Sequence, residues 1–291
     1  MPSHQEVRGA QIGVDRRYWT PVKKIPIRVF PDCFRMICHS KRTIHLGVMA
    51  KYWESGRVKT RLGASIGMSK AAEIHRVFCR HLANGLLGVA EAQSFVITPA
   101  ESRSAFASAL PEGWSIGLQA DGDLGQRIGA WFQNDRATET ASTGLVAGLP
   151  QRSEDKILIG ADCPLLGREL IEQTKSLLAS HDLVIGPAMD GGYYLIAFRQ
   201  GWRPEYMCLM HEMPWSSDHL FDLTCSRARQ AGLRLATLPP MEDIDTIAEL
   251  NRLRAELSAK SSRRFGMSEK ESLWESLREA IERVLSEDDK S

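Results

Sequence analysis

The sequence has no cysteine pair placed for a metal site or a redox motif. Its six cysteines are scattered, and none stands in a C-x-x-C motif or at zinc-ligand spacing. This pattern is typical of reduced thiols, so we expect a cytoplasmic protein. The eight histidines form no metal-spaced cluster, and no Ser elbow or Cys/His arrangement indicates a nucleophilic hydrolase.

Long apolar runs are also missing. The apolar runs are far shorter than the ~18 residues of a membrane span, and the N-terminus lacks the apolar segment of a secretory signal. A net charge of only +1 does not indicate a protein that binds nucleic acid. Residues 1–43 nevertheless hold nine Lys or Arg against three Asp or Glu, with four prolines. We interpret them as a basic, loosely ordered extension.

What the sequence does contain is an alternation of short apolar segments with helical patterns. Strands are predicted at 44–50, 94–98, 114–118, 156–160, 183–187, 193–198 and 234–238, and helices include 215–231 and one capped by Ser69. This order predicts an α/β fold with a single doubly wound, mostly parallel sheet and one antiparallel element.

The last 34 residues differ in composition from the rest. Segment 258–291 begins as a polar linker and ends in an apolar stripe at Leu273, Leu277, Ile281, Val284 and Leu285. The stripe predicts an amphipathic helix that packs on the core or makes a homodimer. The predicted organisation is therefore an extension (1–43), one α/β domain (44–257) and this C-terminal segment.

The segment 44–50 leads into a cationic loop that carries Lys51, Gly56, Lys59, Thr60 and Arg61. Ligands of open α/β sheets bind at the carboxyl ends of the strands, and such a loop suits phosphate oxygens. In an extended loop Lys59 and Arg61 point to the same side. The simpler interpretation is a solvated basic turn.

Carboxylates follow two other predicted strands. Asp162 comes just after strand 156–160, and Asp243 and Asp245 alternate in the loop after strand 234–238. Oxygen ligands at one sheet edge suit Mg²⁺ or Mn²⁺, which would relieve the repulsion between these three side chains. Alternatively, Asp162 and Asp245 cap the helices that follow them.

Two adjacent glycines separate strands 183–187 and 193–198. In Asp190-Gly191-Gly192 the glycines permit positive φ and a close approach of the backbone to a ligand. A plain hairpin turn explains the same residues, and the two interpretations are compatible.

Together these motifs resemble the glycosyltransferase-like family of radical-SAM/selenodomain-associated transferases, a branch of the GT-A nucleotide-diphospho-sugar transferase fold. More distantly, they are similar to guanylyltransferases of cofactor biosynthesis. The motifs that carry the resemblance occur in one order: K-x-x-x-x-G-x-V-K-T-R-L at 51–62, GDLG at 122–125, GADCPLL at 160–166, GPAMDGGYYLIAF at 186–198 and DIDT at 243–246.

The resemblance implies roles for the candidate residues. It implies that Lys51, Lys59 and Arg61 bind phosphates. It also implies that the carboxylates of Asp162, Asp243 and Asp245 bind the metal. It also places Asp190, Gly191 and Gly192 towards the acceptor or donor sugar.

We therefore predict a metal-dependent enzyme that transfers a sugar from a nucleotide-activated donor to a small acceptor. Lys59 and Arg61 would stabilise the leaving group, and Asp162 would hold the metal. The alternative is a nucleotidyltransferase that uses a nucleoside triphosphate and a phosphorylated small molecule and releases pyrophosphate. A third is a nucleotide-binding regulatory domain without turnover.

Overall fold

The computed structural model describes residues 42–134, 154–261 and 269–287. They lie within a unit that spans Ser40–Ser291. The predicted basic extension falls outside the described residues, apart from Arg42 and Thr43. Within the described residues no helix is both long and apolar enough to cross a bilayer.

In this part of the chain seven strands form one sheet in the order β3-β2-β1-β4-β6-β5-β7. They are β1 (Thr43–Lys51), β2 (Ala92–Thr98), β3 (Ser115–Leu118), β4 (Glu154–Gly160), β5 (Leu183–Pro187), β6 (Tyr193–Phe198) and β7 (Leu235–Thr237). β6 is antiparallel to both of its neighbours, and the other pairings in this sheet are parallel. The predicted mostly parallel, doubly wound sheet is confirmed.

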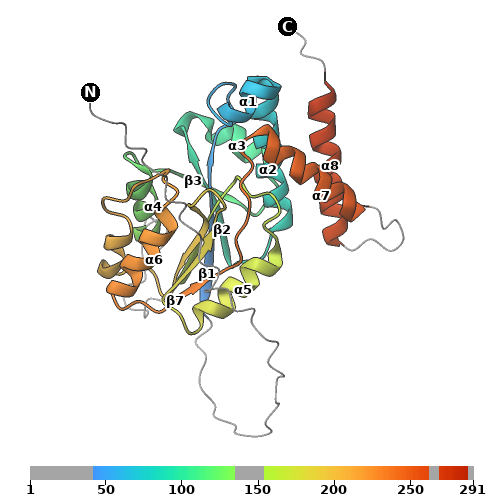
Figure 1. The fold of residues 1–291 in the computed structure, drawn as a ribbon. Coiled ribbons are helices and arrows are strands. Elements are labelled where there is room, and N and C mark those ends of the chain that lie inside the picture. Colours follow the sequence, from blue (N-terminus) through green and yellow to red (C-terminus); the bar gives the residue numbers. More distant parts are fainter. Residues whose placement is uncertain (1–41, 135–153, 262–268, 288–291) are drawn as a thin grey trace, which may run out of the picture. The chain divides into compact units, whose positions relative to one another are not determined.

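Helices cover both faces of the sheet (Figure 1). They are α1 (Thr60–Ile66), α2 (Met68–Gly85), α3 (Arg103–Ala109), α4 (Leu124–Gln133), α5 (Arg168–Leu178), α6 (Leu220–Gln230), α7 (Ile247–Ser261) and α8 (Glu269–Ser286), with 3₁₀ turns η2 (Ala100–Ser102) and η5 (Pro204–Leu209). α4 and α6 lie on one face, and α2, α3 and α5 lie on the other.

The alternation of side chains in β1 explains this arrangement. Leu46 and Val48 join the core on the α2 and α5 face. Gly47 faces α4, where a Cβ would lie 2.4 Å from the Trp131 ring. Helix α4 therefore packs directly on the backbone of β1.

The C-terminal helix α8 packs on its own chain, against α2 and α7. Leu277 and Ile281 are buried in a cluster that includes Phe78 of α2 and Leu253 of α7. Of the two arrangements predicted for this helix, packing on the core is the one found.

Three local predictions are wrong. The loop after β1 is not extended, because Thr60–Ile66 forms α1. Ser69 lies inside α2, and the preceding Gly67, with φ 91°, stands at the N-cap instead. α6 begins at Leu220 rather than Trp215, since Ser216 has a positive φ of 68°, which an α-helix does not allow.

Candidate active site

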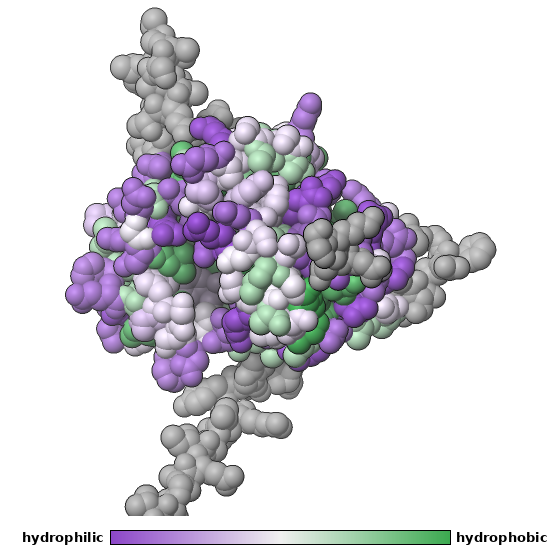
Figure 2. Space-filling view, turned by 90° about the horizontal axis from the view of Figure 1, so that it is seen from above, coloured by the Kyte–Doolittle hydropathy of each residue, from purple (hydrophilic) through white to green (hydrophobic). Residues whose placement is uncertain are grey.

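A cavity of about 550 Å³ lies at the carboxyl edge of the sheet. Its lining comes from the ends of β1 and β4, from β6, and from loops between the elements. Figure 2 views this edge from above and shows a hollow with hydrophilic and hydrophobic surface beside it. Ligands of open α/β sheets bind in such a position.

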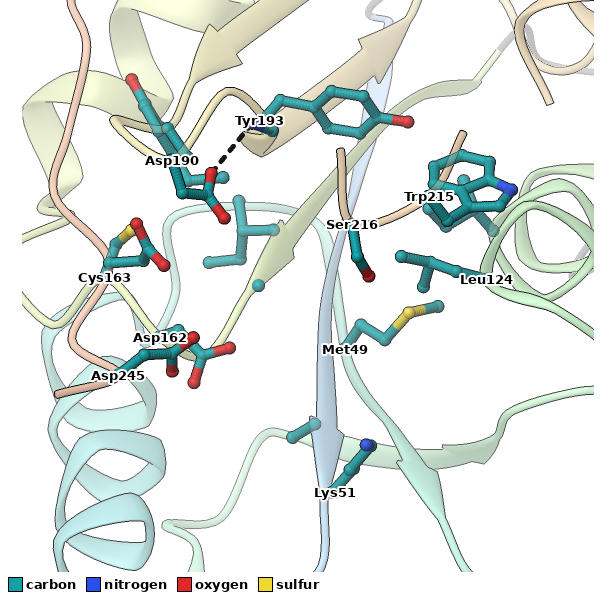
Figure 3. A pocket seen from close by; sticks show the side chains of 18 of the residues that line it. Met49, Lys51, Leu124, Asp162, Cys163, Asp190, Tyr193, Trp215, Ser216 and Asp245 are labelled. Atoms are coloured by element: carbon teal, nitrogen blue, oxygen red, sulfur yellow. Dashed lines mark hydrogen bonds between the residues drawn. The ribbon is translucent and has the colours of Figure 1, made fainter. Parts of the chain in front are cut away.

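Two sets of side chains line the cavity, and Figure 3 shows Asp162 and Asp245 of one set apart from Met49, Leu124 and Trp215 of the other. We call the first the polar side; its members are Lys51, Lys59, His75, Asp162 and Asp245. We call the second the apolar side; its members are Met49, Leu124, Ile128, Tyr193, Trp215 and Leu220.

Lys59 is the centre of the polar side. Its backbone is left-handed (φ 48°, ψ 40°) just before α1, and its side chain is 2% exposed. Nζ donates to Asp245 Oδ1 at 2.9 Å and also pairs with Asp162 Oδ1. Burial lowers the pKa of Lys59, but the two carboxylates outweigh this and raise it above its ordinary value. Lys59 is therefore a buried cation held by two loops.

Backbone hydrogen bonds explain why these loops meet. The Ile244 N–H donates to the Asp162 carbonyl at 3.0 Å. The Met241 N–H donates to Pro187 and the Met189 N–H donates to Met241, each at 3.0 Å. The three loops that carry the predicted acidic residues are thus joined to one another without help from side chains.

His75 is a member of the polar side that the sequence did not indicate. Its Nε2 lies 3.1 Å from the Lys51 carbonyl and, because a carbonyl can only accept, carries the proton. Nδ1 has no hydrogen-bond partner among the described residues and lies 3.8 Å from Asp162 Oδ1. Burial lowers the pKa of His75, so the ring is neutral at pH 7. The Nε2 hydrogen bond ties the end of β1 to α2, and the ring lies beside Asp162.

Asp162 stays ionised in this setting. Burial raises its pKa, but the Lys59 ammonium outweighs that and lowers it below the ordinary value. The competing prediction that Asp162 caps a helix is wrong, because α5 begins only at Arg168, with Gly167 at its N-cap.

Asp243 and Asp245 both line the cavity, with Ile244 buried between them. Burial raises the pKa of Asp243 to about 6, and the negative charge of Asp190 adds to the shift. Asp190 and Asp243 therefore form a second acidic region near the Lys59 pair. At the start of α7 the Glu249 carboxylate accepts hydrogen bonds from the Asp245 and Thr246 N–H groups.

The fit of a metal ion depends on Lys59. Among the described residues, no group of three His, Cys, Asp or Glu side chains is placed to hold a metal. Asp162 and Asp245 nevertheless converge on one cation, the Lys59 ammonium. Mg²⁺ is commonly held by one or two carboxylates together with substrate phosphates. The pair therefore suits a metal that binds together with a phosphate, if Lys59 moves aside.

The other loop residues are placed differently from Lys59. Lys51, Thr60 and Arg61 are exposed and line the cavity. Lys59 and Arg61 both line the cavity, but the backbone between them is not extended as predicted, because α1 begins at Thr60. Gly56 is exposed with φ 78°, a value that favours glycine, and a Cβ there would meet open space.

Asp190-Gly191-Gly192 forms the predicted turn between β5 and β6. Asp190 Oδ1 accepts from the Gly192 N–H at 2.8 Å. Gly191 has φ 92°, and a Cβ there would lie 2.2 Å from the Asp218 carbonyl oxygen. The close approach that requires Gly191 is therefore to the chain itself, whereas Asp190 and Gly192 line the cavity.

Cys163 also lines the cavity, and it is not a nucleophile. Burial raises the pKa of its thiol well above the ordinary value, with Asp162 adding to the shift. The thiol therefore stays protonated and unreactive, in agreement with the absence of a nucleophile motif in the sequence.

Comparison with known proteins places the chain among transferases. Residues 86–217 match the model of a family described as "Uncharacterized protein conserved in bacteria (DUF2064)". The chain is similar to the crystal structure of a candidate nucleotide-diphospho-sugar transferase from Desulfovibrio desulfuricans G20. The identity is 27%, the TM-score is 0.64, and the match covers 84% of this chain and 98% of that one. No curated protein matches this chain.

Two further solved structures are similar to this chain at lower TM-scores. One is 4-diphosphocytidyl-2C-methyl-D-erythritol synthase from Anaerococcus prevotii DSM 20548, with 13% identity, a TM-score of 0.46, and 75% of this chain and 96% of that one covered. The other is CMP:2-keto-3-deoxy-manno-octonic acid synthetase complexed with CTP, with 14% identity, a TM-score of 0.42, and 75% and 99% covered. Likenesses this distant carry no argument about chemistry.

These comparisons confirm the predicted fold and the coarse prediction of an enzyme of the transferase class. The more specific resemblance to radical-SAM/selenodomain-associated transferases stays a prediction.

Proposed function

We propose that the protein transfers a glycosyl group from a nucleotide-activated donor to a small acceptor. The donor's phosphates would bind at the polar side of the cavity. The observation that carries the proposal is the buried Lys59 ammonium between Asp162 and Asp245 at the carboxyl edge of the sheet. The likeness to a candidate nucleotide-diphospho-sugar transferase supports the same class of donor.

The residues of this site have distinct tasks in the proposal. Lys51 and Arg61, which are exposed in the cavity, would bind phosphate oxygens through charge-assisted hydrogen bonds. Lys59 would exchange its carboxylate partners for phosphate as the donor arrives. Mg²⁺ or Mn²⁺, held by Asp162 and Asp245, would supply neutralisation of the diphosphate leaving group. Asp190 would face the acceptor.

Nucleotidyl transfer is the second candidate, and the number of cations favours it. Arg57 lines the same cavity together with Lys51, Lys59 and Arg61. The four cations of the segment 51–61 exceed what a diphosphate needs and suit a triphosphate. In that case an acceptor phosphate would attack the α-phosphorus, and pyrophosphate would leave.

One incubation separates the two candidates. The protein is mixed with Mg²⁺, a panel of sugar nucleotides or nucleoside triphosphates, and a panel of acceptors. Release of a nucleoside diphosphate with a glycosylated product supports glycosyl transfer, and release of pyrophosphate supports nucleotidyl transfer. A nucleotide that binds with Mg²⁺ but yields no product with any acceptor would favour a regulatory domain.

The polar side is tested by Asp162→Asn, which keeps the shape of the side chain and removes its charge. We expect metal-dependent turnover to fall at least about 100-fold while the protein stays folded. Asp121→Asn is the matched control, because Asp121 is exposed and does not line the cavity. Full activity of the Asp162 variant would overturn the assignment.

A further inference from the structure

The apolar side of the cavity is not explained by phosphate binding. Met49 of β1 and Leu124 and Ile128 of α4 meet Trp215 there, and Leu220 begins α6 at the same wall. Figure 3 shows Met49, Leu124 and Trp215 together, away from Asp162 and Asp245. A nucleotide diphosphate has no use for such a wall near its phosphates.

This wall is built rigidly. A Cβ at Gly125 would lie 2.5 Å from the Trp215 ring, so the indole packs directly on the backbone of α4. Trp215 also meets Tyr193 edge-on, with ring centroids 6.4 Å apart. A preorganised apolar surface binds a ligand without the entropic cost of ordering itself.

The wall also leaves apolar surface in contact with solvent. Leu124, a lining residue, is 41% exposed. Exposed apolar surface in the lining of a pocket indicates a binding surface.

Two polar atoms of this side lack partners. Tyr193 OH and Trp215 Nε1 are buried and have no hydrogen-bond partner among the described residues. Unpartnered buried donors are uncommon in folded proteins. Ser216, next to Trp215, holds a positive φ of 68° in an exposed stretch of the cavity rim. The Tyr193 hydroxyl and the Trp215 indole N–H are therefore free to meet an oxygen atom on a ligand.

We propose that the apolar side receives the acceptor, and that the acceptor is an uncharged molecule with an apolar ring or chain and an oxygen that can accept a hydrogen bond. The inference rests on the proposed transferase function and names its acceptor class. Arg127 also lines this side, but its Nε donates to the Gly122 carbonyl at 2.8 Å. The apolar side chains of the wall suit an apolar body, and glucose 1-phosphate tests whether the Arg127 guanidinium instead binds an anion.

The test uses the full chain and the neutral fluorescent probe N-phenyl-1-naphthylamine. A thermal-shift panel of nucleoside diphosphates with Mg²⁺ first identifies the nucleotide that stabilises the protein. Probe binding is then titrated with that nucleotide present, in the wild type, Leu124→Asp and Leu87→Asp. Leu87 is the matched control, because it is 37% exposed and does not line the cavity.

We expect the wild type and the Leu87 variant to bind the probe equally and the Leu124 variant to bind it at least tenfold more weakly. The nucleotide should raise the melting temperature of all three proteins alike. Neutral 2-phenylethanol should displace the probe, and glucose 1-phosphate should not. In Tyr193→Phe the affinity for 2-phenylethanol should fall a few-fold, while the affinity for the hydrocarbon-like probe stays the same.

Other results would overturn the proposal. Equal probe binding by the Leu124 variant and the wild type would show that this wall binds no apolar body. Loss of the nucleotide shift in the Leu124 variant alone would assign the wall to the nucleobase. Displacement of the probe by glucose 1-phosphate would indicate an anionic acceptor. A failure of every nucleotide to stabilise any of the proteins would instead count against the proposed function itself.

Discussion

The two sides of the cavity are held together in different ways. On the polar side, ionic contacts and backbone hydrogen bonds join the loops after β4 and β7 to each other and to Lys59. On the apolar side, β1, α4, β6 and the stretch before α6 meet through close packing, with Gly125 against Trp215. Charged contacts fix where a cation lies, whereas packing fixes only the shape of a wall.

The polar side also has a second layer of support. The Lys59 ammonium lies 5.8 Å from the centroid of the Phe78 ring. Phe78 belongs to a buried cluster with Ile244, which separates Asp243 from Asp245, and with Ile281 of α8. The C-terminal helix therefore supports the polar side from behind and does not reach the apolar side. Substitutions that affect one side and spare the other can test this difference.

The largest effect is expected from Lys59→Met, which removes the shared cation and keeps the length of the side chain. Asp162 and Asp245 would then face each other without neutralisation, and the phosphates would lose a donor. We expect turnover to fall at least about 100-fold, with probe binding at the apolar side unchanged. Arg229→Met, an exposed change on α6, is the control and should be neutral. Loss of probe binding in the Lys59 variant would show that the two sides are not independent.

The next effect concerns the support behind the polar side. Ile281 is fully buried, so Ile281→Ala should lower the free energy of unfolding by about 2–4 kcal/mol through lost burial and a cavity. Urea denaturation measures this. Glu279→Ala, at an exposed position of the same helix, should change it by less than about 0.5 kcal/mol. Equal stability of the two variants would mean that α8 does not pack on α2 in solution.

The third prediction concerns His81 of α2, whose burial should make the stability of the protein depend on pH. Burial lowers the pKa of His81 to about 4, although a hydrogen bond to the Pro164 carbonyl acts in the opposite direction and raises the pKa. The unfolded chain then binds more protons than the folded one between pH 6.5 and 4, so stability falls as the pH falls through this window. For His81 alone the loss from pH 7.5 to pH 5 is about 2 kcal/mol.

The measurement is urea denaturation at pH 7.5 and pH 5 for the wild type and His81→Gln. Glutamine keeps a hydrogen-bond donor and does not titrate. We expect the variant to lose about 2 kcal/mol less than the wild type over this range. Equal losses in the two proteins would show that His81 is not buried in its neutral form.

The smallest effect is expected at the start of α4, on the apolar side. Asp123 accepts from the Gln126 N–H at 2.8 Å, and Gln126 accepts in return from the Asp123 N–H, which completes a capping box. Asp123→Ala should lower the free energy of unfolding by about 1 kcal/mol and weaken probe binding slightly, because Leu124 is the first helical residue. Asp121→Ala should do neither, and equal effects of both would contradict the assigned cap.

Prediction from sequence succeeded where a motif is contiguous and its consequence is local. β5 and β6 begin and end where predicted, because apolar residues and a glycine turn define them. The loop after β1 was predicted wrongly, because Lys59 adopts a left-handed backbone that allows α1 to begin at the next residue.

The candidate site could be predicted in part for the same reason. Cations and carboxylates that follow strands had to meet at the carboxyl edge once the sheet was parallel. His75 and Trp215 could not be found, since each belongs to a helix or loop with no distinguishing motif. Nothing in their spacing indicates that they line the same cavity as Lys59.

The sequence by itself determined the sheet, its single antiparallel strand and the gathering of charge at one edge, because apolar periodicity and strand order depend on local patterns. Only the tertiary structure decided that the Lys59 ammonium lies between Asp162 and Asp245, that α8 covers its own chain, and that an apolar wall completes the cavity. These features depend on contacts between segments far apart in the chain, and Lys59 and Asp245 alone are 186 residues apart. Contacts at that separation follow from packing and leave no mark in local sequence.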